Sequence, residues 1–393
     1  MCAKDQAYSP AVYLTRLSLT DYRNYPAADV TLGPGATAFV GANGQGKTNL
    51  VEAAAYLATF TSHRVATDAP LIRQGAQSAI VRGLVASAGR ESLLEIEINA
   101  GRANRVRLNR APVRPRSALG TLRCVLFAPE DIAIVKGDPD QRRRYLDDLL
   151  VAMRPRYAGV RADYERVLRQ RTALLKSAKA RGGVPPAALE VWDDQLVSAG
   201  AALTAGRLRL VEAVRPLLAG AYSGLSGTER DTDVGYRMSA AGDRSDAADS
   251  GAPGQAAPDA NAEKLTLALR EALAARRRAE LERAVCLVGP HRDELELRIG
   301  GLPARGYASH GESWSLALAL RLAAFRLLRG SGEDPVLLLD DVFAELDTGR
   351  RDRLAALVAD AEQVLVTAAV PEGVPSGLAG VRFQVAGGVI SSA

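Results

Sequence analysis

Cysteine, histidine and aromatic residues are scarce in this sequence of 393 residues. The three cysteines, Cys2, Cys124 and Cys286, are odd in number and far apart, which excludes a disulfide framework, and with only three histidines a zinc cage is not expected. Aromatic side chains make up 5%, which argues against reading single-stranded bases with rows of stacking rings. Contact with nucleic acid is therefore expected to be directed at phosphates.

The sequence also lacks any apolar run near the roughly 18 residues that a membrane-spanning helix needs. Its first residues lack the apolar core of a secretory signal, so we expect a cytoplasmic protein without membrane contact. Hydrophobic residues at 47% and charged residues at 24% are globular proportions. A chain of this length has room for two or three structural units.

Apolar and polar residues alternate along several segments of the first third, which predicts β-strands. In residues 94–98, three apolar side chains alternate with two glutamates, which is typical of an antiparallel sheet with one solvated face. The expected strands are residues 12–22, 36–40, 79–87, 92–100, 104–109 and 122–128.

From about Asp140 the apolar spacing becomes helical and the composition becomes basic. A stripe from Tyr157 to Leu175 predicts a long amphipathic helix that ends near Gly182. In the next helix leucine recurs every seventh residue, which predicts that it lies antiparallel against the first. These leucines are Leu196, Leu203, Leu210 and Leu217, and Pro216 is expected to kink or end this helix.

Residues 227–262 are rich in Gly, Ala, Asp, Ser and Pro, so we expect most of them to form a disordered loop. A third helix, with Leu265, Leu269 and Leu273 on one side, leads to a strand-like segment at 286–290. The last third alternates between helices and apolar strands, which predicts α/β structure with buried parallel strands. The helices are expected at 312–329 and 348–361, and the strands at 336–340 and 363–368.

A phosphate-binding loop is the clearest chemical motif. The pattern G-x-x-x-x-G-K-T follows an apolar strand and precedes a helix, and is formed by Gly41, Ala42, Asn43, Gly44, Gln45, Gly46, Lys47 and Thr48. Its backbone N–H groups can curl around phosphates, the lysine can neutralise them and assist catalysis, and the Thr48 hydroxyl can bind Mg²⁺.

An acidic strand end is the second chemical element. The apolar run 336–339 is followed by Asp340 and Asp341, at the edge of a parallel sheet where a phosphate-binding loop also lies. Asp340 suits Mg²⁺, and Asp341 is the candidate catalytic base that polarises the attacking water. Alone, two acids after a strand more often mark a turn. Together with the loop at 41–48 they predict an ATP site.

Two further motifs surround the acidic strand end. Ser309-His310-Gly311-Glu312-Ser313 opens a helix shortly before it and looks like the signature of ABC ATPases, whereas Glu345-Leu346-Asp347 looks like their D-loop. Taken alone, Ser-x-Gly-Glu is simply a helix N-cap. About 290 residues separate the phosphate-binding loop from the acidic strand end, with the helical arm between them.

Over nearly the whole chain the sequence resembles the RecF family, the recombination mediators of the Rad50/SMC-like branch of ABC ATPases. The matching segments, in order, are LTDYRNY, GANGQGKTNLVEAAAYL, SHR, LFAPEDIAIVKGDPDQRRRYLD, VGPHRDEL, ASHGE and LLLDDVFAELD. The resemblance implies an ABC-ATPase head of the α/β class, with a P-loop α/β sheet, an antiparallel β subdomain and an inserted α-helical arm. The expected domains are 1–140 and 285–393 for the two halves of the head and 141–284 for the arm.

The resemblance also implies cofactors and partners. ATP and Mg²⁺ would bind at residues 41–48 with Asp340, and Ser309, Gly311, Glu312 and Asp347 would complete the site of the opposite subunit in an ATP-dependent, head-to-tail homodimer. Such a protein binds DNA, double-stranded or gapped and without sequence specificity, and helps load RecA at single-strand gaps with RecO and RecR. DNA-stimulated ATP hydrolysis would be weak.

This sequence departs from the family pattern in three places. Glu312 stands where many relatives have Gln, Asp341 where most ABC enzymes have the longer Glu, and Thr367 where a switch histidine is expected. The shorter base and the missing histidine are consistent with slow hydrolysis, with ATP acting mainly to hold the dimer together.

The roles of several other residues are left open by the sequence. Arg64 can reach a phosphate, but a surface salt bridge is equally compatible with its position. For the adenine contact, Tyr22 and Arg23 are guesses. His291 in the segment VGPHRDEL is more compatible with a structural role.

The arm carries the positive charge. Residues 142–181 hold twelve Lys or Arg against four acids, a balance of +8 in a chain whose net charge is +5. We expect them to bind phosphates rather than to form an ordinary solvated helix face, with an affinity that falls steeply with salt. The candidate DNA-binding residues are Arg142, Arg143, Arg144, Arg169, Lys176 and Lys179.

Two other functions fit parts of this pattern. In a nucleotide-gated scaffold, ATP would dimerise the heads to recruit repair partners, and hydrolysis would be incidental. The ATPase subunit of a transporter is less compatible, because the sequence has no membrane-contact signal and carries a long arm between its nucleotide motifs.

Overall fold

The structure is a computed structural model that describes residues 12–181, 186–241, 260–378 and 380–392. The chain divides into two compact units. Unit 1 comprises residues up to Asp131, Gly224–Gly227 and Arg321–Ala393, and unit 2 comprises Ile132–Ser223 and Thr228–Leu320. These limits differ from the expected boundaries at 140/141 and 284/285, because residues 285–320 pack with the helices of unit 2 rather than with the C-terminal strands. The expected division into head and arm stays a prediction.

Unit 1 contains an antiparallel sheet of six strands, in the order β2-β1-β4-β5-β6-β7. Its strands bury every second residue, so the alternation in the sequence predicted it correctly. Its bounds are β1 Val12–Tyr22, β2 Tyr25–Thr31, β4 Ser78–Ser87, β5 Arg90–Asn99, β6 Arg105–Leu108 and β7 Ala111–Val113, with the short helix α2 at Pro115–Ala118.

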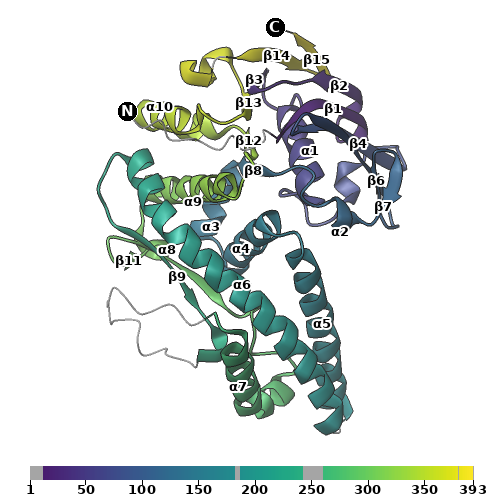
Figure 1. Cartoon of the computed structure of the whole chain (residues 1–393), viewed down its shortest axis with the longest axis vertical. Helices are drawn as coiled ribbons and strands as arrows, with labels where there is room; N and C mark the ends of the chain where they lie inside the picture. The colour runs from purple at the N-terminus through teal and green to yellow at the C-terminus, as the bar shows by residue number, and fades with distance from the viewer. Residues whose placement is uncertain (1–11, 182–185, 242–259, 379, 393) are drawn as a thin grey trace. The chain divides into compact units, whose positions relative to one another are not determined.

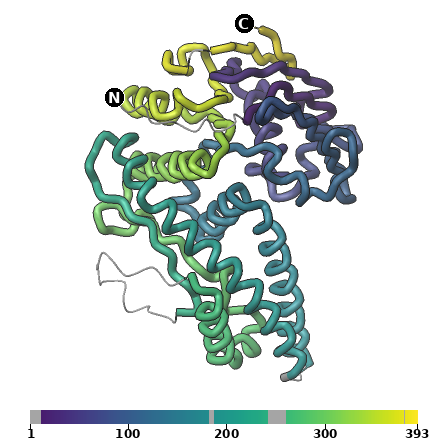
Figure 2. Tube along the Cα trace, in the orientation of Figure 1, coloured from purple at the N-terminus to yellow at the C-terminus, as the bar shows by residue number. Residues whose placement is uncertain are grey.

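The second sheet of unit 1 has the order β15-β14-β3-β13-β12-β8, and all its neighbours are parallel except β15 against β14. The expected strand 122–128 belongs here and not to the antiparallel sheet. Figure 2 shows segments from the two ends of the chain meeting in this sheet. The bounds are β3 Gly35–Val40, β8 Cys124–Phe127, β12 Val336–Leu339, β13 Gln363–Ala368, β14 Val381–Ala386 and β15 Val389–Ser392.

Helix α1, Lys47–Thr59, contacts strands of both sheets, namely β4 and β5 on one side and β8, β12 and β13 on the other (Figure 1). The buried amide of Gln363 also links the sheets: its Nε2 donates to the carbonyls of Leu14 and Gly33, and its Oε1 accepts from the Leu14 N–H. Because these backbone groups are buried, each needs such a partner. The two sheets therefore share one core.

Unit 1 is completed by helix α10, Thr348–Val358, and by residues 321–330 of α9, His310–Gly330. These agree with the helices expected at 348–361 and 312–329. Short 3₁₀ turns lie at Ala69–Leu71, Pro129–Asp131, Val342–Glu345, Pro371–Gly373 and Ser376–Leu378.

Unit 2 is mostly helical. Its helices are α3 Ile132–Lys136, α4 Pro139–Met153, α5 Tyr157–Arg181, α6 Pro186–Ser226 up to residue 223, α7 Ala262–Arg283, α8 Ala304–Tyr307 and the start of α9. Helix α6 continues through Pro216, so of the two outcomes expected there, a kink or an end, the end is wrong. Val214 and Leu218 are buried on either side of the proline, and this packing outweighs the one hydrogen bond that proline removes.

Helices α5 and α6 are antiparallel, as the seven-residue leucine spacing predicted. A Cβ atom at Gly206 would lie 2.7 Å from the Tyr157 ring, and one at Gly200 would lie 3.4 Å from the Tyr164 ring. One heptad further along α5, the Arg171 Nε donates to Asp193 Oδ1 of α6 at 2.6 Å. The residue numbers of these contacts rise along α5 while they fall along α6, as they must in an antiparallel pair.

A small antiparallel sheet, in the order β11-β10-β9, corrects two expectations. Strand β9, Thr232–Arg237, lies within the segment expected to be disordered, and pairs along its whole length with β10, Glu294–Ile299. The edge strand β11 is Leu302–Pro303, and a 3₁₀ turn follows β9 at Ser239–Ala241. Residues 286–290 form no strand. The rest of the expected loop, 242–259, lies outside the described residues.

Candidate nucleotide-binding site

The phosphate-binding loop joins β3 to α1, as its sequence context predicted. Gly44 and Gly46 adopt φ angles of 81° and 113°, which disfavour any residue with a side chain. A Cβ atom on Gly46 would lie 2.6 Å from Asn24 Nδ2, and one on Gly41 would lie 2.1 Å from the Val385 carbonyl. The glycines are therefore required by the backbone itself.

The Lys47 ammonium is folded back into its own loop. Its Nζ donates to the carbonyls of Gly41 at 2.7 Å and Ala42 at 3.0 Å, and the residue is 6% exposed. Burial lowers the pKa of Lys47 from its usual value, and the nearby carboxylates Asp341 and Asp340 oppose that shift. A phosphate placed in the loop would offer this cation a stronger acceptor than the two carbonyls do.

Two residues missed by the sequence reasoning hold the loop from outside. Asn24 Nδ2 donates to the Gln45 carbonyl at 3.1 Å, and the Tyr25 hydroxyl donates to the Gly46 carbonyl at 3.1 Å. Both belong to LTDYRNY, the segment in which the sequence offered Tyr22 and Arg23, but not these two residues, as binding candidates. Gln45 Oε1 accepts in turn from the Gly387 N–H, so the loop is fixed by both ends of unit 1.

The phosphate-binding loop and the acidic strand end meet directly. The Thr48 hydroxyl donates to Asp340 Oδ1 at 3.0 Å, across 292 positions of sequence. The same oxygen accepts from the Thr367 hydroxyl at 2.8 Å. Asp340 is 3% exposed, and its pKa is raised by burial against the opposing effect of these two hydrogen bonds.

This donor set fits Mg²⁺, because the hydroxyl of Thr48 and the carboxylate of Asp340 are hard oxygen ligands on adjacent elements. Within the described residues, no group of three His, Cys, Asp or Glu side chains is placed to hold a metal ion. A cation here would depend on the phosphates of a nucleotide for further ligands, as Mg²⁺ sites of this kind usually do.

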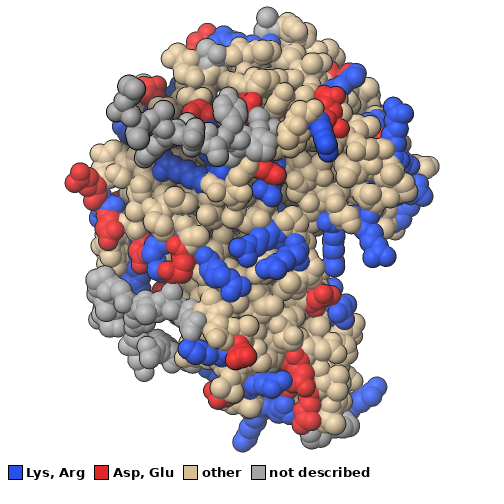
Figure 3. Space-filling model, viewed as in Figure 1, with Lys and Arg blue, Asp and Glu red and all other residues tan. Residues whose placement is uncertain are grey.

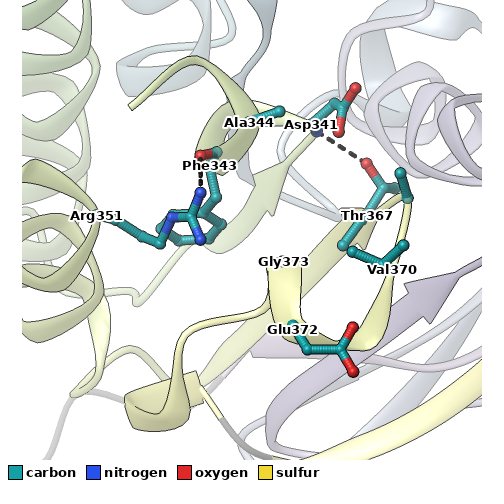
Figure 4. A pocket seen from close by; sticks show the side chains of 10 residues that line it. Asp341, Phe343, Ala344, Arg351, Thr367, Val370, Glu372 and Gly373 are labelled. Carbon is teal, nitrogen blue, oxygen red and sulfur yellow. Dashed lines mark hydrogen bonds between the residues drawn. The ribbon is translucent and has the colours of Figure 1, made fainter. Parts of the chain in front are cut away.

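Asp341 borders an open pocket of about 310 Å³ (Figure 4). The residue adopts a φ of 52°, and its backbone N–H donates to the Thr367 hydroxyl at 2.9 Å. The pocket wall also contains Phe343, Val370 and Glu372. Asp340 therefore lies against α1, and Asp341 lies at the edge of the pocket.

Arg64 lies beside the loop helix. Its Nη1 donates to Asn49 Oδ1 at 3.0 Å and lies 3.4 Å from Glu52 Oε2, and its side chain is 34% exposed. Glu52 is fully buried. Burial alone would raise its pKa, but hydrogen bonds from Arg23 and Ser62 hold the pKa below its usual range. Arg64 therefore keeps an exposed part next to the phosphate-binding loop.

The two guesses for the adenine contact are not supported by the geometry. Tyr22 is fully buried, so its ring has no exposed face for a base. Arg23 places Nη2 on Glu52 Oε1 at 2.6 Å and Nη1 on the Pro70 carbonyl. Arg23 instead ties the turn between β1 and β2 to Glu52 of α1, and Tyr22 belongs to the buried core.

The signature-like segment lies in unit 2 and forms a capping box at the start of α9. The Ser309 hydroxyl accepts from the Glu312 N–H at 3.2 Å, and the Glu312 carboxylate accepts from the Ser309 N–H at 2.9 Å. Glu312 also pairs with Arg230, which precedes β9. Ser309 and Gly311 differ in exposure: Ser309 is exposed and Gly311 is half-buried. In unit 1, Asp347 caps α10 by accepting from the Arg350 N–H at 2.9 Å.

Comparison with known proteins identifies the family. Residues 13–382 match the model described as the RecF/RecN/SMC N terminal domain. The chain is 57% identical over 384 residues to the DNA replication and repair protein RecF of Frankia alni, covering 96% of this chain and 99% of that protein. It is also 57% identical over 382 residues to the RecF of Kineococcus radiotolerans, covering 94% and 96%. The chain belongs to the RecF family.

Solved structures agree with this assignment. The recombination mediator protein RecF in complex with ATP, of the RecFOR pathway, superposes with a TM-score of 0.87 at 27% identity, covering 99% of both chains. An Smc head domain bound to the C-terminal domain of ScpA shares the fold at a TM-score of 0.55 and 18% identity. The expected ABC-ATPase head is confirmed, and this RecF-family chain has a role in DNA replication and repair.

The basic face of this RecF-family protein differs from the sequence expectation. Arg142 is 4% exposed and pairs with Glu294, so it cannot reach DNA, and Arg143 donates to the Asp293 carbonyl. Arg144 is exposed and lies 3.6 Å from Asp148. In Figure 3, blue side chains lie over the helices of unit 2 with red ones among them.

Three of the candidate DNA-binding residues remain suited to phosphate. Arg169, Lys176 and Lys179 are exposed on α5, and within the described part of the chain none of them forms an ion pair. Arg171, on the same helix, is 1% exposed and binds Glu280 and Asp193. The charge count alone could not separate these two groups, but helical periodicity can, since Arg171 lies on the stripe of Tyr164 and Leu175.

The segment VGPHRDEL of this RecF-family chain forms a buried polar network. His291 Nδ1 lies 2.6 Å from the Tyr164 hydroxyl, and its Nε2 lies 3.1 Å from the Cys286 carbonyl. Burial lowers the pKa of His291 to about 4. Asp293 accepts from the Tyr236 hydroxyl at 2.7 Å. These contacts support the structural interpretation of His291.

None of the described helices is long and apolar enough to cross a membrane.

Proposed function

We propose that this chain is an ATP-dependent DNA-binding protein of recombinational repair and replication restart. In this proposal, ATP joins two copies head-to-tail on DNA, and slow hydrolysis releases them. The contact between Thr48 and Asp340 carries the proposal, because it brings the phosphate-binding loop and the acidic strand end into one oxygen-rich site.

Each residue of the site has a defined task. The N–H groups of residues 41–48 and the ammonium of Lys47 bind the phosphates. Thr48 and Asp340 would hold Mg²⁺, which neutralises phosphate charge when bound. Asp341, at the border of an open pocket, is placed to accept a proton from an attacking water. Arg64, one third exposed beside α1, is available for a phosphate oxygen.

The second half of each site would come from the other copy. Ser309 begins α9, so its hydroxyl and the first N–H groups of the helix form an anion-binding end. Gly311 has no side chain that could exclude a phosphate, and Asp347 caps α10, which follows the acidic strand end. A nucleotide held between the loop of one copy and the signature of its partner would make dimerisation depend on ATP.

Exposed cations of the helical unit would hold the DNA. Arg169, Lys176 and Lys179 lie at spacings of seven and three residues along α5, compatible with one face of the helix. They would bind backbone phosphates of duplex or gapped DNA without sequence specificity. A RecF of the RecFOR pathway among the similar structures supports RecO and RecR as partners. RecA loading in the cytoplasm is the output that the family resemblance implies.

Sedimentation of the full-length protein with and without MgATP, and with a gapped duplex added, tests the proposal. We expect ATP-dependent dimers for the wild type but not for Lys47→Met or Ser309→Arg. Exposed positions provide matched controls, Lys136→Met and Ser331→Arg, which should behave as the wild type. A wild type that stays monomeric with ATP and DNA contradicts the proposal.

A nucleotide-gated scaffold is the alternative. The short carboxylate of Asp341 favours it, because a shorter base is expected to hydrolyse ATP slowly and a scaffold does not depend on hydrolysis. Asp341→Asn separates the two functions. If hydrolysis times release, this variant should form dimers that persist on DNA and should fail to complete repair. If the protein is a scaffold, the variant should recruit its partners and support repair as the wild type does.

A further inference from the structure

Thr367 occupies the middle of the nucleotide site. Its strand, β13, lies between β3, which leads into the phosphate-binding loop, and β12, which leads into the two aspartates. Thr367 pairs with Phe39 of β3 in the register of the sheet, one residue before the end of that strand. The residue is 1% exposed.

The direction of both hydrogen bonds of Thr367 is fixed by chemistry. The backbone N–H of Asp341 can only donate, so the Thr367 oxygen accepts there at 2.9 Å. The hydroxyl proton is then free to point at Asp340 Oδ1, 2.8 Å away, which accepts it as a carboxylate. One hydroxyl therefore ties together the side chain of the first aspartate and the backbone of the second.

Thr48 and Thr367 donate to the same oxygen but differ in what else they do. The Thr48 hydroxyl has Asp340 as its described acceptor, so it is the contact that can open when oxygen ligands turn toward a cation. Thr367 keeps a second bond to Asp341, whose φ of 52° lies in the left-handed region that few residues other than glycine adopt. A backbone in this conformation needs support from its surroundings.

We propose that Thr367 is a positioning residue that holds the cation ligand Asp340 and the base Asp341 in a fixed relation through its single hydroxyl. This inference rests on the proposed nucleotide site. It assigns a role to the residue that stands where the switch histidine of related ATPases was expected. Figure 4 shows the bond from Asp341 to Thr367 at the edge of the pocket.

Two substitutions separate the hydroxyl from the shape of the side chain. Thr367→Val keeps the volume but leaves the Asp341 N–H without its acceptor and Asp340 without one donor. Thr367→Ser keeps the hydroxyl. Thr37→Val is the matched control, because it makes the same change at a buried residue of β3, opposite Leu365.

Three measurements on the full-length protein follow these variants. For Thr367→Val we expect kcat for ATP to fall by about tenfold or more with little change in KM, because a hydrogen bond to a charged group is removed. We expect Mg²⁺ to increase the affinity for ATP less than in the wild type. Amide hydrogen exchange at Asp341 should become faster. Thr367→Ser and Thr37→Val should stay near the wild type in all three.

Failure of the inference and failure of the proposed function give different results. If the wild type neither binds nor hydrolyses MgATP, the proposed function fails, and hydrogen exchange at Asp341 still decides whether Thr367 supports this backbone. If the wild type is active and Thr367→Val matches it in turnover and in Mg²⁺ dependence, the inference is overturned. A loss shared equally by the Val and Ser variants would also overturn it.

Discussion

Arg230 and Glu312 form an ion pair at the start of α9, where the signature serine caps the helix. The pKa of Glu312 is held below its usual value by hydrogen bonds from Ser309 and by Arg230. The family pattern implied by the resemblance has Gln at position 312, so this chain carries an extra negative charge where a nucleotide phosphate is proposed to dock. Arg230, supplied from the segment before β9, offsets that charge.

Arg230→Ala is therefore expected to weaken ATP-dependent dimerisation several-fold, because it leaves an uncompensated carboxylate near the phosphates. The double variant Arg230→Ala, Glu312→Gln should recover the wild-type dimerisation constant, and Glu312→Gln alone should be close to neutral. Sedimentation at several ATP concentrations measures all four proteins. Additive effects of the two substitutions would contradict the charge-compensation argument.

Replacing Arg169, Lys176 and Lys179 with alanine should weaken DNA binding and make it less sensitive to salt. The slope of log K against log salt is expected to fall by about one unit for each DNA phosphate that the variant no longer binds. Fluorescence anisotropy with a labelled gapped duplex at several salt concentrations gives this slope. As a control, the same number of charges can be removed from unit 1 by replacing Arg90, Arg102 and Arg105 with alanine. If that variant weakened DNA binding equally, the effect would come from net charge alone.

Arg171→Ala should destabilise unit 2 by about 3–5 kcal/mol, because it leaves the buried Glu280 carboxylate without its cation and leaves Asp193 with Arg277 alone. Arg166→Ala, on the same helix, should cost under about 0.5 kcal/mol, since its pair with Asp163 is exposed. Urea unfolding, monitored through amide hydrogen exchange in α5 and α7, measures the free energy of unfolding of both variants. A cost for Arg171→Ala no larger than that for Arg166→Ala would show that the buried pair is not formed.

His291 should make unit 2 less stable in acid. Its pKa falls from 6.5 to about 4 on burial, so below pH 6.5 the unfolded chain binds a proton that the folded chain rejects. The resulting loss of stability begins near pH 6.5 and is complete near pH 4, at about 3 kcal/mol. Thermal unfolding of the wild type and of His291→Gln between these pH values isolates the contribution. Parallel curves for the two proteins would contradict it.

The sequence predicted the nucleotide site better than its surroundings. The phosphate-binding loop and the aspartates are contiguous motifs, and a parallel sheet brings its strand ends to one edge, so Thr48 and Asp340 were expected to meet. Thr367 was noted as a substitution for histidine, but its two hydrogen bonds depend on β13 lying between β3 and β12. Strand order between distant segments cannot be read from local periodicity.

Other misses have a common physical cause, which is that tertiary packing overrides local composition. Strand β9 lies in a segment of turn-forming residues and is a strand because β10 supplies its hydrogen bonds. Pro216 stays inside α6 because the neighbouring residues are buried. Arg142 and Arg171 contributed to a basic count, but acids from other elements, half-buried Glu294 and buried Glu280, pair with them.

The parallel sheet draws β3 from residues 35–40 and β12 to β14 from residues 336–386. On the ribosome, at about 5–20 residues per second, the phosphate-binding loop is thus made roughly 15–60 s before the strands that flank it. All of unit 2 is synthesised within that interval. We expect the helical unit to fold first during synthesis, while the earlier β3 and α1 wait for their partners and are the segments most in need of chaperone protection.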